Sequence, residues 1–269
     1  MSSTQITKAS FVVMKMDDVL SVDAMIAVSS PVLPHPSTFL QQLVARCPDV
    51  EIELEGEENE NTFTFTIAGN KAIVALVTKQ IPWTDLEEQC AVAWWWPEAT
   101  QTMQAHTAHV LVAILGDNGS ALERYVHLTH LTAVVTEKTE SLGVLFGSGS
   151  VVHPAKAFVS RSEGVSQENV DPLLWIDMRV EQNDDGSLRF YSLGMTFLGM
   201  HELEIDSVWL EAEELLDFAY STIAYILASG EVIMEGETIG RSEDEVVVAS
   251  YVPSMWNSER TVLKLGFSS

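Results

Sequence analysis

Residues 62–78 read TFTFTIAGNKAIVALVT, and this stretch contains the pattern that decides the fold. Phe63, Phe65 and Ile67 alternate with threonines, so they lie on one face of an extended strand. Residues 69–70 (GN) are a tight-turn signal, and the apolar run after them predicts a second, more buried strand. The stretch therefore predicts a hairpin within a β-sheet that has one buried face.

Strand and helix patterns continue on both sides of this hairpin. Strands are predicted at residues 8–15, 51–55, 109–115, 142–146, 173–181, 188–194, 201–205, 246–252 and 261–265, and helices at 38–46, 85–93, 121–136, 155–160 and 211–228. The first third reads β-α-β-β-β, and the middle repeats the order strand, helix, strand. We predict an α+β fold with mixed or mainly antiparallel sheets and helices packed on one face. The recurring order also raises the hypothesis of two similar β-α-β-β halves, although no repeat of residues accompanies it.

No linker rich in proline, glycine and serine divides the chain. We therefore predict two intimately packed halves, residues 1–105 and 106–269, rather than separate domains.

The composition is strongly acidic. The chain has 269 residues with 39 acids and 14 bases, which gives a formal net charge of −25. The acids divide into 18 and 21 between residues 1–150 and 151–269, so the charge is not confined to a tail. Such a surface disfavours nucleic acid and anionic membranes as partners and attracts basic proteins, although solubility alone also explains it.

The chain shows the features of a protein of a reducing compartment. Its two cysteines, Cys47 and Cys90, are far apart and form no metal-binding or disulfide framework. The first residues lack the pattern of a secretory signal, and no apolar run approaches the ~20 residues needed to span a bilayer. We expect a cytoplasmic protein.

Two features are candidates for partner binding. Trp94, Trp95 and Trp96 are consecutive, so they cannot all face one core on a regular element, and an exposed indole suits an interface. The alternative is that all three are wedged between layers of the fold. The second feature is an acidic segment whose carboxylates either meet a basic partner or solvate an edge strand. Its acids are Glu51, Glu53, Glu55, Glu57, Glu58 and Glu60.

A metal site has weaker support. Glu123, His127 and His130 lie near one face of a predicted helix, where a divalent metal ion could bind, but the HExxH pattern is absent. Polar residues on an ordinary helix explain the same spacing. We predict neither a metal nor a cofactor.

Several stretches together resemble DUF4261, a bacterial family of unknown function. They are WWWPEA (94–99), HTAHVL (106–111), LWIDMRV (174–180), LGMTFLGMHELEI (193–205) and GETIG (236–240), and the resemblance is strongest over residues 190–265. The family brings no established activity, so it assigns no catalytic residue. The resemblance implies an α+β fold and an association with bacterial secretion and toxin loci.

The leading hypothesis is a non-catalytic protein that binds a basic partner. Its most concrete form is an immunity protein that inhibits a basic toxin such as a secreted nuclease, and a secretion adaptor or chaperone is closely related. The alternatives are a metal-assisted hydrolase and a self-associating protein that buries the tryptophan run in a homo-oligomer.

Overall fold

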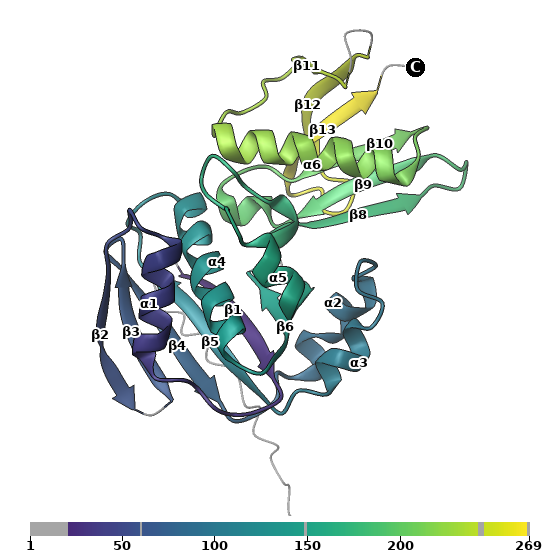
Figure 1. Cartoon of the computed structure of the whole chain (residues 1–269). Coiled ribbons are helices and arrows are strands. Elements are labelled where there is room, and N and C mark those ends of the chain that lie inside the picture. Colours follow the sequence, from purple (N-terminus) through teal and green to yellow (C-terminus); the bar gives the residue numbers. More distant parts are fainter. Residues whose placement is uncertain (1–20, 60, 148–149, 242–244, 268–269) are drawn as a thin grey trace, which may run out of the picture.

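The protein has an α+β fold with two sheets. The structure, a computed structural model, describes residues 21–59, 61–147, 150–241 and 245–267, and of residues 56–59 only the backbone. The strand predicted at residues 8–15 lies outside the described residues. Figure 1 shows one sheet at each end of the molecule, with helices packed against both.

Sheet A is formed by the first half of the chain. Its strands are β1 (Ser21–Val28), β2 (Ile52–Asn59), β3 (Thr62–Ile67), β4 (Asn70–Val77), β5 (Ala108–Leu115), β6 (Ser141–Phe146) and β7 (Val151–Pro154). They run in the order β2-β3-β4-β5-β1-β6-β7, and every neighbouring pair is antiparallel. The predicted hairpin is β3–β4: Ile67 pairs with Asn70, and Ala68 and Gly69 turn the chain with φ of 47° and 74°. Positive φ at both positions matches the twist of the strands.

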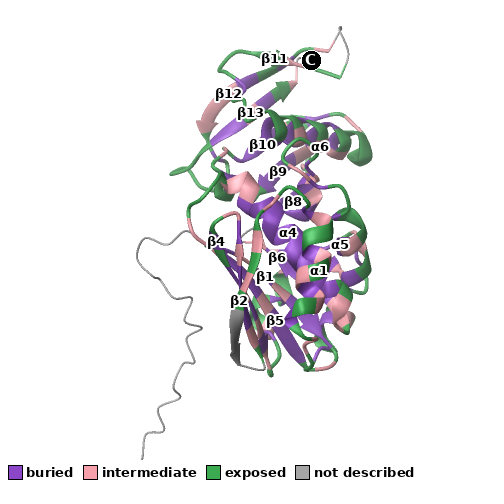
Figure 2. Ribbon diagram, turned by 60° about the vertical axis from the view of Figure 1, so that its left-hand side comes forward, coloured by how far each residue is buried: buried purple, intermediate pink, exposed green. Residues whose placement is uncertain are grey.

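Both faces of sheet A carry helices. The face covered by α1 (Pro36–Arg46), α4 (Ala121–Lys138) and α5 (Ala155–Arg161) contains Ile26 and Val28 of β1. Ala27, which points the other way, belongs to a second apolar cluster with η1 (Trp83–Asp85), α2 (Glu87–Val92) and α3 (Ala99–Gln104). Helices therefore cover one face broadly, as predicted, and the other face at the β1–β6–β7 end. In Figure 2 the buried residues follow the strands of sheet A and α4.

Sheet B is formed by the second half of the chain. Its strands are β8 (Asp177–Gln182), β9 (Leu188–Leu193), β10 (Leu203–Val208), β11 (Thr238–Ile239), β12 (Val247–Pro253) and β13 (Thr261–Phe267), in the order β11-β12-β13-β10-β9-β8. Only the β10–β13 pair is parallel among the described pairs. Helix α6 (Ala212–Ser229) packs on one face and ends at Gly230, whose φ of 66° closes the helix. Short 3-10 turns, η2 (Pro172–Leu174) and η3 (Met195–Leu198), flank β8 and β9.

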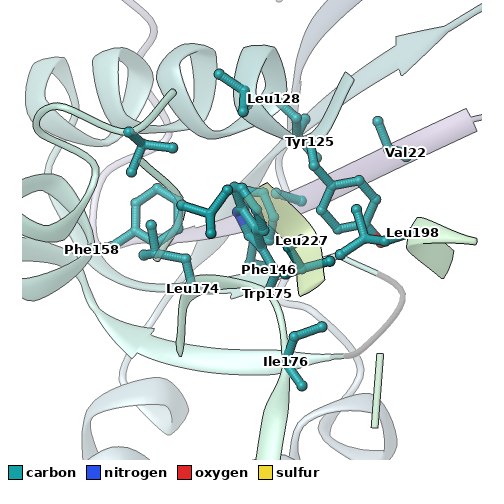
Figure 3. Packing of buried hydrophobic residues seen from close by; sticks show 14 of the residues in the cluster. Val22, Tyr125, Leu128, Phe146, Phe158, Leu174, Trp175, Ile176, Leu198 and Leu227 are labelled. Carbon is teal, nitrogen blue, oxygen red and sulfur yellow. The ribbon is translucent and has the colours of Figure 1, made fainter. Parts of the chain in front are cut away.

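One core joins the two sheets. Trp175, fully buried, donates its indole N–H to Thr129 Oγ1 of α4 at 2.8 Å and meets the Tyr125 ring edge-on, with the centroids 5.8 Å apart. Figure 3 shows Trp175 among side chains from both parts of the chain, including Phe146 of β6 and Leu227 of α6. The two sheets therefore form one packing unit.

The predicted division at residues 105 and 106 falls inside sheet A. Strand β5 pairs with β4 from the first predicted half, and β6 pairs with β1. The boundary between the sheets lies instead between β7 and β8. The two runs of strand, helix and strand that suggested a duplication begin with the strands predicted at residues 8–15 and 109–115. The first of these strands lies outside the described residues; the rest of the first run is α1 and β2, the second run is β5-α4-β6, and the described strands of both belong to sheet A. The strand after α1 is at the sheet edge, whereas the strand after α4 pairs with β1.

Candidate functional site

The described part of the acidic segment, residues 51–59, consists of β2, the edge strand of sheet A, and the residue before that strand. Glu51, Glu53 and Glu55 are exposed, whereas Ile52 and Leu54 pack against the core. This is the alternation that the sequence predicts. Glu55 accepts a hydrogen bond from Thr66 of the neighbouring strand. Glu57 and Glu58 belong to β2, but their side chains, like the whole of Glu60, lie outside the described residues.

The three tryptophans point in different directions because the chain turns after α2. Trp94 is 61% exposed, Trp95 is half-buried and Trp96 is 6% exposed. The indole N–H of Trp95 donates to the carbonyl of Val152 in β7 at 3.1 Å. Trp96 packs over Gly143 of β6, where a Cβ would lie 2.7 Å from its ring. The prediction that Trp96 contacts a partner is therefore wrong, since its side chain is part of the core; Trp94 and the rim of Trp95 are accessible.

The acidic strand and the tryptophan run lie at opposite edges of sheet A. Strand β2 is the first strand of the sheet and β7, which anchors Trp95, is the last. Six inter-strand spacings of about 4.8 Å separate them by roughly 29 Å, and Figure 1 shows β2 and α2 on opposite sides of the molecule. The two predicted partner-binding features do not form one contact patch.

Trp94 borders a groove between the two sheets, which we call the Trp94 groove. It consists of an inner cavity of about 220 Å³ and an outer part of about 590 Å³. Both parts are lined by Trp94, Leu173 of η2 and Met178 of β8. The inner cavity continues between β7 and α5, and the outer part continues along α6. The groove is thus built from elements of both sheets.

Unpaired acids line the outer part of the groove. Glu213 and Asp217, four residues apart on α6, lie on the same side of the helix, are exposed, and make no hydrogen bond or ion pair within the described residues. Their neighbour Glu214 lies 3.9 Å from Arg241. We call Glu213, Glu214 and Asp217 the α6 acidic ridge. Asp217 also borders a second hollow, of about 800 Å³, on the other side of α6.

The cations near the groove are neutralised within the chain. Arg161, the only cation among the described residues that line it, donates to Asp171 at 2.9 Å. Arg179 of β8 donates to Asp177 at 2.7 Å and lies 3.9 Å from Glu88 of α2. Burial raises the pKa of Asp177, and the Arg179 guanidinium opposes that rise. The net charge presented by the groove is therefore negative.

Sequence reasoning did not identify the α6 acidic ridge as a site. Acids are common in the first turn of a helix because the helix dipole favours negative charge there, so this cluster alone does not indicate a surface site. The spacing of Glu213 and Asp217, on the exposed side of an otherwise apolar helix, is the signal that could have indicated a surface. Their closeness to Trp94 depends on tertiary packing and has no local signal.

The candidate metal ligands do not converge. His127 and His130 are 5% and 6% exposed, and burial lowers the pKa of each imidazole. The His130 ring bonds the Val165 carbonyl at 2.9 Å, whereas Glu123 is only half-buried at the start of α4. In the described part of the chain, no group of three histidine, cysteine or acidic side chains is placed to hold a metal ion.

Two buried glutamates of the stretch 201–205 (HELEI) stabilise loops. The Glu202 carboxylate accepts hydrogen bonds from two hydroxyls and three backbone N–H groups of residues 192–196. Glu204 accepts from the Ser254 hydroxyl and from the backbone N–H of Met255, at 3.1 Å. His201 is exposed, and its Nδ1 donates to the Thr261 carbonyl at 3.0 Å. The polar atoms of these side chains are therefore occupied by hydrogen bonds that hold the loops of sheet B.

Residues 191–266 match the family model described as Domain of unknown function (DUF4261). The resemblance noted in the sequence is therefore confirmed over β10, α6, β11, β12, β13 and the end of β9. The α6 acidic ridge lies inside the matched region, whereas Trp94 and the inner cavity lie outside it. Comparisons with curated proteins and with solved structures gave no match. Within the described ranges, no helix is long and apolar enough to cross a membrane.

Proposed function

We propose that this chain, with its DUF4261 region, is a non-catalytic acidic protein that binds a basic protein partner through the Trp94 groove and the α6 acidic ridge. In its most specific form it is an immunity protein that neutralises a basic bacterial toxin, such as a secreted nuclease effector, from the cytoplasm. A secretion adaptor or chaperone would use the same surface.

The observation that carries this proposal is the combination of an exposed indole with unpaired acids. An indole that is 61% exposed at the mouth of an apolar hollow has the chemistry of an interface anchor. Glu213 and Asp217 lie along the same groove without an intramolecular counter-ion within the described residues. A partner with an apolar side chain beside lysine or arginine would satisfy both features.

The overall charge favours basic partners over other proteins and accelerates their association with this chain. A formal net charge of −25 attracts a basic protein over long distances and repels phosphate backbones. An inhibitor of a nuclease needs this property, because its carboxylates can occupy the cleft that normally binds phosphates. Long-range attraction accelerates encounter, whereas the contacts at the groove determine how long the complex persists.

The test compares two matched charge reversals. The tagged protein is used to isolate partners at low and then moderate salt, and the retained protein is purified and its affinity measured. Glu213→Lys with Asp217→Lys is compared with Glu51→Lys with Glu53→Lys. Each pair replaces two charges of −1 by two of +1, so both change the formal net charge from −25 to −21.

We expect the α6 pair to weaken binding about tenfold or more and the β2 pair to change it much less, because only the α6 carboxylates would contact the partner. Equal effects would mean that binding follows net charge alone. A loss confined to the β2 pair would move the interface to the edge strand. If no basic protein is retained even at low salt, the proposal fails.

The alternative of a metal-assisted hydrolase has no supporting observation among the described residues. Its candidate ligands Glu123, His127 and His130 form no cluster suited to a metal ion. Metal analysis of the purified protein, with His127→Ala for comparison, tests it directly.

A further inference from the structure

The inner cavity beneath Trp94 has a composition that selects apolar groups. Trp95, Ile176 and Met178 contribute to its walls, and the latter two are 1% and 2% exposed. A hydrogen bond also stabilises the wall, since the indole N–H of Trp95 donates to the Val152 carbonyl. A group that enters this cavity therefore loses water and gains apolar contacts.

The polar residues of the cavity do not offer a free charge. The His153 ring contacts the Leu174 carbonyl through Nε2 at 3.2 Å, and burial lowers its pKa to about 4, so the imidazole is neutral at neutral pH. The guanidinium of Arg161 is bound to Asp171 at 2.9 Å. An anionic or cationic ligand would find no unpaired opposite charge inside the cavity.

The volume decides what kind of group fits. A cavity of about 220 Å³ exceeds the roughly 150 Å³ that holds a benzene ring. It is smaller than the roughly 300–1,000 Å³ of sites that enclose cofactors and drug-sized ligands. There is room for one large apolar side chain, such as that of phenylalanine, leucine or methionine.

The outer part of the groove determines which residues can stand next to the inserted one in the partner's sequence. It shares Trp94, Leu173 and Met178 with the inner cavity and leads to Glu213 and Asp217. A chain segment with one residue in the cavity must therefore pass the two carboxylates. Lysine or arginine next to the inserted residue would pair with them.

We infer that the inner cavity is an anchor pocket for one large apolar side chain in a lysine- or arginine-rich segment of the partner. This inference rests on the proposed function and specifies its recognition element. Trp94 forms the wall of the pocket at its mouth, and Glu213 and Asp217 of the α6 acidic ridge bind the flanking cations.

The test uses defined peptides and the full chain. The probe is a short synthetic peptide with one phenylalanine between lysines; one control peptide has alanine in place of phenylalanine, and another has glutamate in place of lysine. Binding is followed by tryptophan fluorescence and by NMR. Ala157→Phe fills the cavity from α5, and Ala228→Phe adds the same ring at an exposed position of α6 as its matched control.

We expect the phenylalanine–lysine peptide to bind and both control peptides to bind at least tenfold more weakly. Ala157→Phe should reduce binding by a similar factor, and Ala228→Phe should not. Trp94→Ala provides a second disruption that leaves the core intact, because this indole is largely exposed. Peptide binding that is unchanged by Ala157→Phe and by Trp94→Ala overturns the anchor pocket.

The two proposals can fail separately. If a purified basic partner depends on Glu213 and Asp217 but is unaffected by Ala157→Phe, the proposed function stands and the anchor pocket is wrong. If no basic partner exists but the peptide binds as described, the pocket is real and the proposed function is wrong.

Discussion

Replacing Glu202 by alanine should destabilise sheet B by an amount that follows from its hydrogen bonds. Glu202 is 7% exposed, and its carboxylate accepts from the N–H groups of Gly194, Met195 and Thr196 at 2.9, 3.2 and 3.2 Å. Thr196 is exposed and can turn to water, whereas Gly194 and Met195 are buried. The two buried N–H groups left without an acceptor, at about 1–3 kcal/mol each, give a loss of roughly 2–6 kcal/mol, before any cost at the buried Ser192 hydroxyl is added.

Urea unfolding followed by circular dichroism measures this loss. Glu202→Gln should cost less, because one acceptor oxygen remains and the Ser192 hydroxyl can turn to accept from the new amide. The exposed Glu213→Ala is the control and should stay within about 0.5 kcal/mol of the parent protein. A Glu202→Ala protein that loses less than about 1 kcal/mol would refute the idea that this carboxylate holds the loop.

Three further predictions concern buried groups. Burial lowers the pKa of His153 from 6.5 to about 4, so its contribution to stability is complete above pH 6.5 and is lost as the pH falls towards 4. A His153→Leu protein should therefore lose about 2 kcal/mol less than the parent between about pH 7.5 and pH 5 in urea unfolding, and an unchanged pH dependence would contradict this. Burial raises the thiol pKa of Cys47 and Cys90 to about 11; a disulfide reagent near pH 8 should modify the folded protein at least about a hundredfold more slowly than the unfolded chain. Trp175→Phe removes the hydrogen bond to Thr129 and should cost about 1–3 kcal/mol while leaving one unfolding transition by fluorescence and circular dichroism; two separate transitions would contradict a shared core.

Elements with a strong local pattern could be predicted from the sequence. The alternation in TFTFTI and the turn after it placed β3 and β4 correctly. The apolar stripe and Gly230 placed α6 to within one residue at each end. In both cases the periodicity of burial is recorded in neighbouring residues.

Strand β1 shows where local patterns fail. Residues 21–28 read SVDAMIAV and form a central strand between β5 and β6, yet the sequence reading assigned no element there. Ile26, Ala27 and Val28 are all buried because helices cover both faces at this point, so the alternation disappears. The same tertiary pairing crosses the predicted division at residue 105, since β5 joins strands that precede it.

The candidate site was predictable only in part. Three consecutive tryptophans are conspicuous in the sequence and indicated a candidate site. Which of the three indoles is exposed depends on the turn that follows α2. The acids of residues 51–55 and of α6 look alike in sequence. Only the packing of α6 beside Leu173 and Met178 places Glu213 and Asp217 next to Trp94.

The segment that matches DUF4261 begins at Tyr191, in the middle of β9, and omits β8 and Trp175. If this segment were excised at those limits, the first three residues of β9 would be missing and the sheet would lose its last strand. The buried side of α6 would also lose the neighbours that Trp175 and the adjacent residues provide. The segment that the family model matches is therefore not a complete packing unit. Any chimera or truncated version of this protein should retain the sequence from η2 onward together with α4, on which that sequence rests.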